Sequence, residues 1–416
     1  MPAASRYDEL IQPDRVHGSL YTDPAIWADE LRRIWYRTWV FVGHESEVPN
    51  AGDFVAKSIG PQPVIMMRGR DGVLRLFFNR CPHRANTVCE AERGNAKALK
   101  CAYHGWTFAN TGELLAFPFA SGYGSGERTA DFALAQVPRV DRTHGFVFAS
   151  LAPDGPTLGE HLGAAQEVFD RLARLSPEGR VELTAGWLRH RVRANWKLLL
   201  ENETDGYHPP FVHASIFSVA DSAIGALYGD RSEAVSRDLG NGHTEDDLRP
   251  EFRRKAVPMG WFGTTEGKLP AYAARMRDAY GEAAEQILVD GSPHVMVFPN
   301  LFIAEIQVFV LQPLAVDETV QHVTALQFAG APELNERMLR QTNGSVGPAG
   351  FLLADDSELY ERNQRGAQAL APQWLVMRRG LHRERLDDRG LRVGHVTDEV
   401  AQRGIWRHYR SLMEEP

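Results

Sequence analysis

The sequence predicts an α+β chain of two domains. An all-β module is expected over about residues 39–153, and residues 1–38 and 154–416 are expected to form a larger domain in which helices flank an antiparallel sheet. Length is one reason, because 416 residues exceed what a single small core needs. Pattern is the other. Short β-forming runs such as WVFVG, PVIMMR and VLRLFF, separated by Gly, Pro and Asp, give way to strand-like runs interspersed with helical stretches.

The elements of the larger domain follow in chain order. A helix is predicted in TDPAIWADELRRIWYRTW, where Asp23 can cap the helix and Pro24 can occupy its first position. A helical stretch is expected near 158–175, after the β module. Beyond it, strands are predicted at 187–193, 294–299, 302–311 and 319–328, and helices at 196–208, 270–288, 331–341, 356–370 and 398–413.

Composition excludes several classes of protein. Hydrophobic residues make up 43% and charged residues 24% of the chain, as in an ordinary globular protein. The net charge of -8 argues against a nucleic-acid-binding protein. No secretory signal or membrane helix is apparent. Three clustered cysteines do not make a disulfide framework, so a cytoplasmic location is expected.

The cysteines belong to two short motifs, Cys81-x-His83 and Cys101-x2-His104. Zinc is one reading, but zinc fingers tend to use Cys-Cys and His-His pairs. Here each pair offers one sulfur and one nitrogen. A Rieske-type [2Fe–2S] cluster needs two thiolates on one iron and two imidazoles on the other, and two β-hairpin tips can supply them. The third cysteine, Cys89, is out of register and is expected to be an ordinary buried residue.

The surroundings of these motifs fit such tips. Pro82 and Gly105 are expected to shape them, and Tyr103 and Trp106 to shield one side of the cluster. Basic residues crowd the same stretch on an otherwise acidic chain. They either dock an acidic ferredoxin or form a solvated face, and they are Arg80, Arg84, Arg93, Lys97 and Lys100.

A second site is predicted in NWKLLLENETDGYHPPFVHASIF, residues 195–217. On a straight helix His208 and His213 would point about 140° apart. Pro209 is expected to end or kink the helix at His208, so that His213 turns toward it. Two histidines and a carboxylate form the facial triad of non-haem Fe(II) oxygenases. Asp355 and Asp356 are the carboxylate candidates, although either could simply cap a helix.

Together these residues make the chain resemble the Rieske non-haem iron oxygenases, specifically the large (alpha) subunit of aromatic-ring-hydroxylating enzymes. The resemblance is carried by CPHR at 81–84, CAYHGW at 101–106, the N-x2-D-x2-H-x4-H pattern ending at His213, GPAGF at 347–351, and a D-x4-E-x2-Q-x-G pattern at Asp356, Glu361, Gln364 and Gly366. It implies a [2Fe–2S] cluster on Cys81, His83, Cys101 and His104. It also implies a mononuclear iron on His208, His213 and Asp356, with Asp355 in the surrounding shell.

The resemblance further implies an activity. Electrons from NAD(P)H, passed through a ferredoxin or flavin reductase, enter at the cluster, and O2 is used at the iron to hydroxylate an aromatic ring. Either cis-dihydroxylation or monohydroxylation is possible, and an aromatic carboxylate is the favoured substrate. An oxidative demethylase of the same fold is one alternative. A redox or electron-transfer protein without oxygenase activity is another.

Asp205 and Asn202 are expected to assist the iron site. At i, i+3 from His208, Asp205 would share its helical face and reach its outer nitrogen. The resemblance implies a head-to-tail homotrimer, with or without a small beta subunit, in which Asp205 links His208 to His104 of the next chain. Candidate pocket walls are Val346, Leu352, Phe211, Val297, Phe302 and Val308, although the last four could equally be core.

Overall fold

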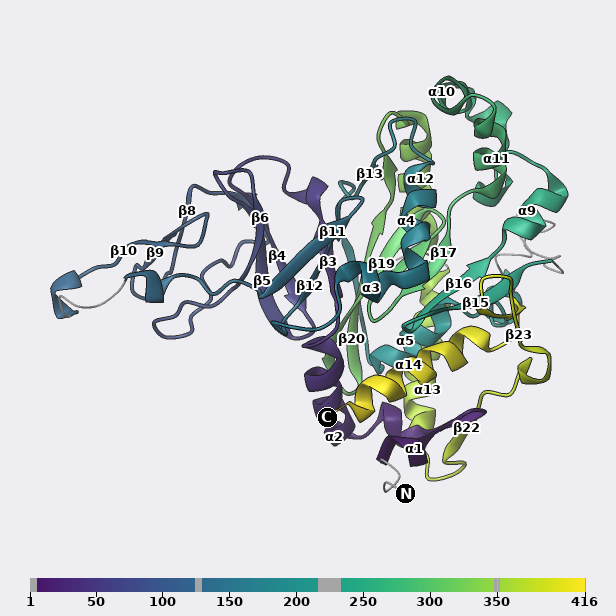
Figure 1. The fold of residues 1–416 in the computed structure, drawn as a ribbon, viewed down its shortest axis with the longest axis horizontal. Coiled ribbons are helices and arrows are strands. Elements are labelled where there is room, and N and C mark those ends of the chain that lie inside the picture. The colour runs from purple at the N-terminus through teal and green to yellow at the C-terminus, as the bar shows by residue number, and fades with distance from the viewer. Residues whose placement is uncertain (1–5, 124–128, 216–232, 348–349, 351, 416) are drawn as a thin grey trace. The chain divides into compact units, whose positions relative to one another are not determined.

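The computed structural model describes residues 6–123, 129–215, 233–347, 350 and 352–415. It divides into two compact units, Trp35–Leu158 and a larger one made of Met1–Ile34 and Gly159–Pro416 (Figure 1). The boundaries expected from the sequence, 39 and 153, lie a few residues inside the smaller unit. Among the described residues, no helix is long and apolar enough to cross a membrane.

The smaller unit is built from antiparallel strands, which confirms the all-β expectation. Its three sheets have the orders β6-β5-β4-β7, β11-β12-β3 and β10-β9-β8. The strands are β3 (Val40–His44), β4 (Asp53–Ile59), β5 (Gln62–Arg68), β6 (Leu74–Phe78), β7 (Arg93–Asn95), β8 (Ala98–Lys100), β9 (Thr107–Ala109), β10 (Leu114–Ala116), β11 (Arg139–Thr143) and β12 (Phe146–Ser150). Short 3-10 turns lie at Glu45–Glu47, Ala120–Gly122 and Thr129–Phe132.

The larger unit is organised by a nine-stranded antiparallel sheet of order β14-β20-β19-β18-β17-β16-β15-β24-β23. Its strands are β14 (Leu188–Val192), β15 (Val235–Gly240), β16 (His243–Asp247), β17 (His294–Val297), β18 (Leu301–Ala304), β19 (Gln307–Ala315), β20 (Glu318–Ala325), β23 (Arg385–Leu386) and β24 (Arg392–His395). Small sheets join β1 (Ile11–Gln12), β2 (Arg15–His17) and β22 (Trp374–Val376), and β13 (Val181–Glu182) with β21 (Gln327–Phe328).

Helices pack against this sheet, as the α+β prediction requires. Helix α14 contacts β15 and β16, whereas α5 contacts β17 and β19 and also touches α13 and α14. The α-helices are α1 (Arg6–Leu10), α2 (Pro24–Glu30), α3 (Leu158–Leu162), α4 (Gln166–Ala173), α5 (Trp196–Glu203), α6 (Pro209–Val212), α9 (Arg249–Lys255), α10 (Pro270–Tyr280), α11 (Ala283–Asp290), α12 (Pro332–Ser345), α13 (Leu353–Ala367) and α14 (Val400–Glu414). A π-turn at Leu31–Trp35 and 3-10 turns at Gly18–Tyr21, Gly163–Ala165, Gly260–Phe262, Glu266–Lys268 and Leu381–Arg383 complete the unit.

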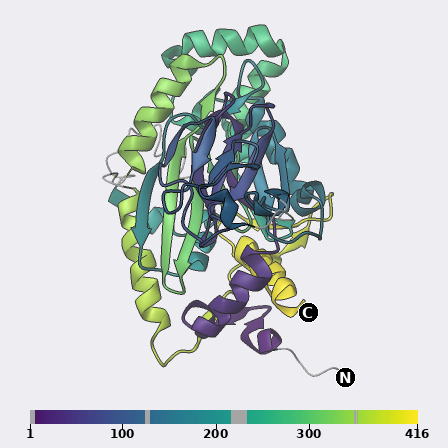
Figure 2. The same cartoon turned by 90° about the vertical axis from the view of Figure 1, so that its left-hand side faces the viewer.

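The start of α2 is as predicted. Asp23 accepts a hydrogen bond from the backbone N–H of Ala25, and Pro24 is the first helical residue. Figure 2 shows the N-terminal helices beside the C-terminal helix α14, and α1 contacts α14 directly.

A buried carboxylate joins these ends to α5. Glu30, at the end of α2, accepts hydrogen bonds from Lys197, from the indole of Trp196 at 2.9 Å and from the hydroxyl of Tyr409 at 2.6 Å. A buried carboxylate needs several hydrogen-bond donors, because it has lost its hydrogen bonds to water and each one that is not replaced costs free energy. The arrangement ties α5, which precedes the candidate iron site, to both ends of the chain.

Three of the predicted elements differ from the structure. The run at 302–311 is not one strand but two, β18 and β19, joined at Glu305–Ile306. The helix predicted at 270–288 breaks at Gly281, whose φ of +56° only glycine adopts at low cost. The helix predicted at 196–208 ends at Glu203. Apolar patterning does not detect any of these breaks, because apolar residues continue at similar spacing on both sides of each break.

Candidate metal centres and substrate cavity

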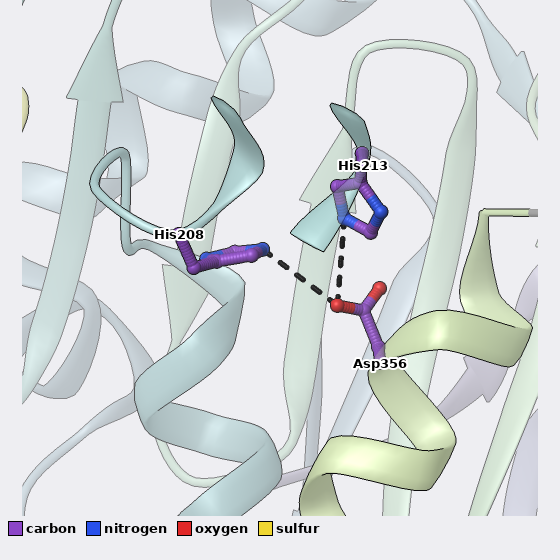
Figure 3. Close-up of side chains that lie close together, drawn as sticks. All are labelled: His208, His213 and Asp356. Atoms are coloured by element: carbon purple, nitrogen blue, oxygen red, sulfur yellow. Dashed lines mark ion pairs between the residues drawn. The ribbon is translucent and has the colours of Figure 1, made fainter. Parts of the chain in front are cut away.

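Three of the predicted ligands meet in the larger unit (Figure 3). His208 directly precedes α6, His213 directly follows it, and Asp356 lies in the first turn of α13. Oδ1 of Asp356 is 3.4 Å from Nε2 of His213 and 3.7 Å from Nε2 of His208. One ligand atom from each residue lies within 4.8 Å of the others. These three side chains could hold one metal ion.

The chain reaches this geometry by a route other than the expected proline kink. The residues between α5 and α6 form a turn, and His208 itself adopts right-handed helical angles of φ -72° and ψ -33°. The proline after His208 disfavours this conformation but does not forbid it. The carbonyl of His208 accepts hydrogen bonds from the N–H groups of Phe211 and Val212, which offset the cost. A separate short helix therefore brings His213 round.

Each histidine also faces a second carboxylate. Nδ1 of His208 is 3.7 Å from Oδ2 of Asp205, and Nδ1 of His213 is 3.9 Å from Oδ2 of Asp355. Metal-bound imidazoles commonly point their outer nitrogen at such a group. Asp205 does not share a helical face with His208, because α5 has already ended. Instead its Oδ1 accepts the N–H of Tyr207 in a tight turn that turns the carboxylate toward His208.

The charges of the site suit a metal cation. Burial and the proximity of His208 lower the pKa of His213 to about 4, so this imidazole is neutral and able to coordinate. Burial, with the charge of Asp355, raises the pKa of Asp356 to about 7 although His208 opposes the shift. A cation beside this buried carboxylate would restore its ionised form. The donor set of two nitrogens and one oxygen fits iron of the non-haem type.

Sequence reasoning named Asn202 but missed two of the residues around it, Tyr360 and Glu203. Asn202 donates a hydrogen bond to the hydroxyl of Tyr360 at 2.9 Å and to Oδ1 of Asp356 at 3.4 Å. Tyr360 stands four residues after Asp356 on α13, a spacing that places both on one helical face and could have indicated it. Glu203 is buried and accepts a hydrogen bond from Gln321 on β20. Nothing in the sequence pattern indicated that pair.

A cavity of about 500 Å³ opens onto the three ligands. Its size suits a small organic molecule. Three of the predicted wall residues, Val346, Leu352 and Phe302, line it. Its remaining apolar and aromatic lining includes Leu248, Trp261, Phe262, Ile306, Phe309 and Leu353. The GPAGF stretch lies partly outside the described residues, since the positions 348, 349 and 351 are not among them.

The other wall candidates do not line the cavity. Phe211 is 70% exposed and packs edge-on against Tyr207, because the short α6 turns it outward. Val297 and Val308 are fully buried in the strands β17 and β19 and belong to the core. Strand alternation decides which side chains face the cavity, and the turn at Glu305–Ile306 changes the register that a continuous strand would have had.

The cysteine–histidine motifs lie in two loops with the same hydrogen bonds. In the first, the N–H of Ala85 bonds the carbonyl of Cys81. In the second, the N–H of Gly105 bonds the carbonyl of Cys101. Both closing residues have positive φ, +59° for Ala85 and +72° for Gly105. The second loop is a hairpin tip between β8 and β9, as predicted. The first is not a hairpin tip, because β6 pairs with β5 and β7 pairs with β4.

These loops bring the four predicted ligands together. The rings of His83 and His104 are 4.5 Å apart, and Nδ1 of His83 is buried without a hydrogen-bond partner among the described residues. Burial raises the pKa of Cys81, whose sulfur lies beside that of Cys101. Trp106 stacks on His83 with its ring 5.1 Å away and is itself buried. An imidazole nitrogen without a hydrogen-bond partner and two adjacent sulfur atoms fit a cluster with two nitrogen and two sulfur ligands.

The residues around the loops differ in exposure. Tyr103 packs against His104 but is 59% exposed, so it covers the predicted cluster site less than the buried Trp106 does. Cys89 is buried in the same core, as expected of a small buried residue. The five basic residues of this stretch are all exposed. Their role in docking an electron donor stays a prediction.

Comparisons with known proteins agree with these two sites. Residues 38–137 match the Rieske [2Fe-2S] domain, and residues 172–415 match the ring hydroxylating alpha subunit (catalytic domain). The chain is 30% identical to toluate 1,2-dioxygenase subunit alpha of Pseudomonas putida, over 86% of this chain and 82% of the relative. It is 32% identical to the anthranilate 1,2-dioxygenase large subunit of Burkholderia cepacia, over 96% and 93%. A solved naphthalene 1,2-dioxygenase with indole in its active site superposes with a TM-score of 0.85 at 26% identity, covering 97% of this chain and 92% of that one.

Proposed function

This chain belongs to the Rieske ring-hydroxylating oxygenases as a large (alpha) subunit, and from that premise we propose how its own residues serve the oxygenation of an aromatic ring. Members of this family contain a [2Fe–2S] cluster and a mononuclear iron, receive electrons from a ferredoxin or reductase, and incorporate O2 into their substrates. The observation that carries the proposal is the convergence of His208, His213 and Asp356 at the cavity.

At the cavity, His208 and His213 would hold the iron through Nε2 and Asp356 through its carboxylate. The iron supplies O2 chemistry when bound. The protein's part is to keep the imidazoles neutral, to orient them and to present a mostly apolar cavity to the ring. Asp205 and Asp355 orient the two histidines through their outer nitrogens, and Asn202 positions Asp356. Asp205 and Asn202 are thus positioning residues.

In the smaller unit, Cys81 and Cys101 would bind one iron of the cluster and His83 and His104 the other. Trp106 fixes the ring of His83 by stacking on it. His104 is exposed on the surface of its unit, a placement that supports a role in passing electrons to a partner. We propose a cytoplasmic homotrimer in which Asp205 faces a cluster histidine of the next chain.

Ring hydroxylation is better supported than oxidative demethylation. The relatives that align along most of this chain are named as ring dioxygenases acting on toluate, anthranilate and naphthalene. A purely electron-transferring role would need no second metal site, and the cavity with its three convergent ligands argues against it.

The direct test measures oxygen uptake and product together. Reconstituted with iron and supplied with a surrogate reductase and NADH, the protein should consume O2 and form hydroxylated products from at least one ring in a panel of aromatic acids, amines, phenols and hydrocarbons. A protein that holds both metal centres but oxidises no member of the panel would contradict the proposed function.

Replacing a cluster histidine should change the cluster without removing it. In His104→Cys a thiolate takes the place of a neutral imidazole, and the added negative charge should lower the reduction potential by about 250 mV or more. The average g value of the reduced EPR signal should rise toward that of all-cysteine clusters. Tyr103→Phe is the matched control, because this neighbour offers no ligand atom. A colourless protein loaded with zinc would overturn the cluster assignment.

A further inference from the structure

One wall of the cavity holds a charged pair that the oxygenase chemistry does not use. Nδ1 of His294 is 3.0 Å from Oε1 of Glu305, and Nε2 of the same ring is 2.9 Å from the backbone carbonyl of Glu203. A carbonyl and an ionised carboxylate can only accept hydrogen bonds. Both ring nitrogens must therefore carry a proton, which makes His294 a cation paired with Glu305.

The electrostatics of the wall agree with this reading. Burial opposes the charged form of His294, but the charges of Glu305 and Asp246 overcome it and raise the pKa of the histidine to about 9. Both nitrogens are already engaged, so His294 has no donor left for a substrate. It acts instead as an anchor that holds Glu305 at the cavity.

Glu305 occupies a backbone position that glutamate disfavours. It begins the two-residue turn Glu305–Ile306, because Ala304 pairs with Gln307 across β18 and β19. Its φ is +33°, in the left-handed region where glycine or asparagine would be relaxed. Strain of this kind persists where the surrounding structure holds the residue in place, and it clusters at active sites and ligand-binding sites. Among the described residues, His294 is the one hydrogen-bonding partner of this carboxylate, and it engages Oε1. Oε2 remains as an acceptor at the cavity.

The part of the lining that the structure describes offers no basic side chain for a substrate anion. Among the described lining residues there is no lysine or arginine. The carboxyl groups there belong to Glu203, Asp205, Asp246, Glu305 and Asp356. Even with a ferrous ion on the three ligands and with the cationic His294, the carboxyl groups of the described lining outnumber its positive charges. A ring carboxylate would therefore enter a cavity with a net negative lining, at a large desolvation cost.

We propose that Glu305, held in place by His294, accepts a hydrogen bond from the substrate, and that the enzyme selects an aromatic ring bearing an N–H or O–H group over a ring carboxylate. This rests on the proposed function. The sequence alone had favoured aromatic acids, and the test below compares these two substrate classes directly. Phe302, whose ring is 4.8 Å from that of His294, offers an aromatic face beside the acceptor.

The test compares four rings of similar size, aniline, phenol, toluene and benzoate, in the iron-loaded enzyme with a surrogate reductase. We expect kcat/KM from product formation to favour aniline or phenol over toluene by about 10- to 100-fold, the value of one hydrogen bond to a charged acceptor. Benzoate should be the poorest of the four. The aniline and phenol arms show whether the donor is nitrogen or oxygen.

Two variants assign the preference to Glu305. Glu305→Gln removes the charge at nearly constant size, and Glu305→Asn relaxes the left-handed backbone, so at least one should fold normally. In both variants, the ratio of kcat/KM for aniline or phenol to kcat/KM for toluene should fall about 10-fold or more. Glu318→Gln, a carboxylate on β20 that pairs with Arg191 outside the cavity, should leave the ratio unchanged. Benzoate oxidised as well as aniline and phenol, or a ratio unaffected by either variant, would overturn the inference while ring oxygenation stands. Oxidation of none of the rings in a metal-loaded enzyme would count against the proposed function as well.

Discussion

Asp356→Ala is expected to abolish mononuclear iron binding and turnover while the cluster keeps its colour. Oδ1 of Asp356 is the atom toward which Nε2 of both histidines point, and two imidazoles alone are a poor site for Fe(II). The ligands of the cluster lie in a separate unit of the chain, so they should be untouched. Metal analysis should show loss of about one iron per chain, and the rate of product formation should fall by more than about 100-fold, beyond the usual effect of losing an outer partner.

Asp355→Ala is the matched control for that experiment. Asp355 is the preceding residue, also an aspartate and on the same helical turn, but its carboxylate faces the outer nitrogen of His213 at 3.9 Å. Its removal should cost about 10-fold in activity and little iron. If Asp355→Ala lost the iron and Asp356→Ala kept it, the assignment of the ligand would be wrong by one residue.

Asp205→Ala is expected to lower the turnover rate by about 100-fold while leaving the cluster and most of the iron in place. Asp205 does not face the shared ligand point. It lies on the outer side of His208, with Oδ2 3.7 Å from Nδ1, and it is partly exposed. A partly exposed carboxylate beside the outer nitrogen of His208 is well placed to contact the next chain of the proposed homotrimer. In single-turnover experiments with substrate and O2, the reduced cluster of the variant should therefore fail to reoxidise.

Asp205→Asn separates two roles of this side chain. The amide can still accept the N–H of Tyr207 and keep the turn, but it cannot carry the charge. An orienting residue should then be largely rescued, with cluster reoxidation at the normal rate. Normal reoxidation in the alanine variant as well would leave Asp205 with no part in electron transfer, and would remove the support for the intersubunit route.

The cluster site could be predicted from the sequence more fully than the mononuclear metal site. The cluster loops were predictable, because four ligands, the tight turns and the stacking tryptophan all lie within residues 81–106 and their spacing constrains them locally. Even in this unit, the strand pairing around the first loop could not be predicted from the sequence. The sequence predicts a hairpin of β6 and β7, yet β5 and β4 lie between these two strands in the sheet, since β-strand partners are chosen by packing across the whole unit.

The three side chains predicted to bind iron do lie together in the structure, but the local reason given for their meeting was partly wrong. His208 and His213 meet through a turn and a short helix rather than a kinked long one, and Asp356 comes from a helix far along the chain. The prediction of Asp356 depended on a family resemblance, since a pair of adjacent aspartates in isolation is more often a helix cap.

The sequence by itself determined the α+β class, the capped start of α2, and the residues able to bind metals, because each depends on spacing along a short stretch of chain. Only the tertiary structure decided which side chains line the cavity. The segment 302–311 has the alternation of a single strand, and nothing local marks Glu305 as a turn residue. The left-handed backbone there is sustained by the pairing of β18 with β19 and by the bond from His294, which come from other parts of the fold. Long-range contacts of this kind override local preference, and here they place the carboxylate of Glu305 at the cavity.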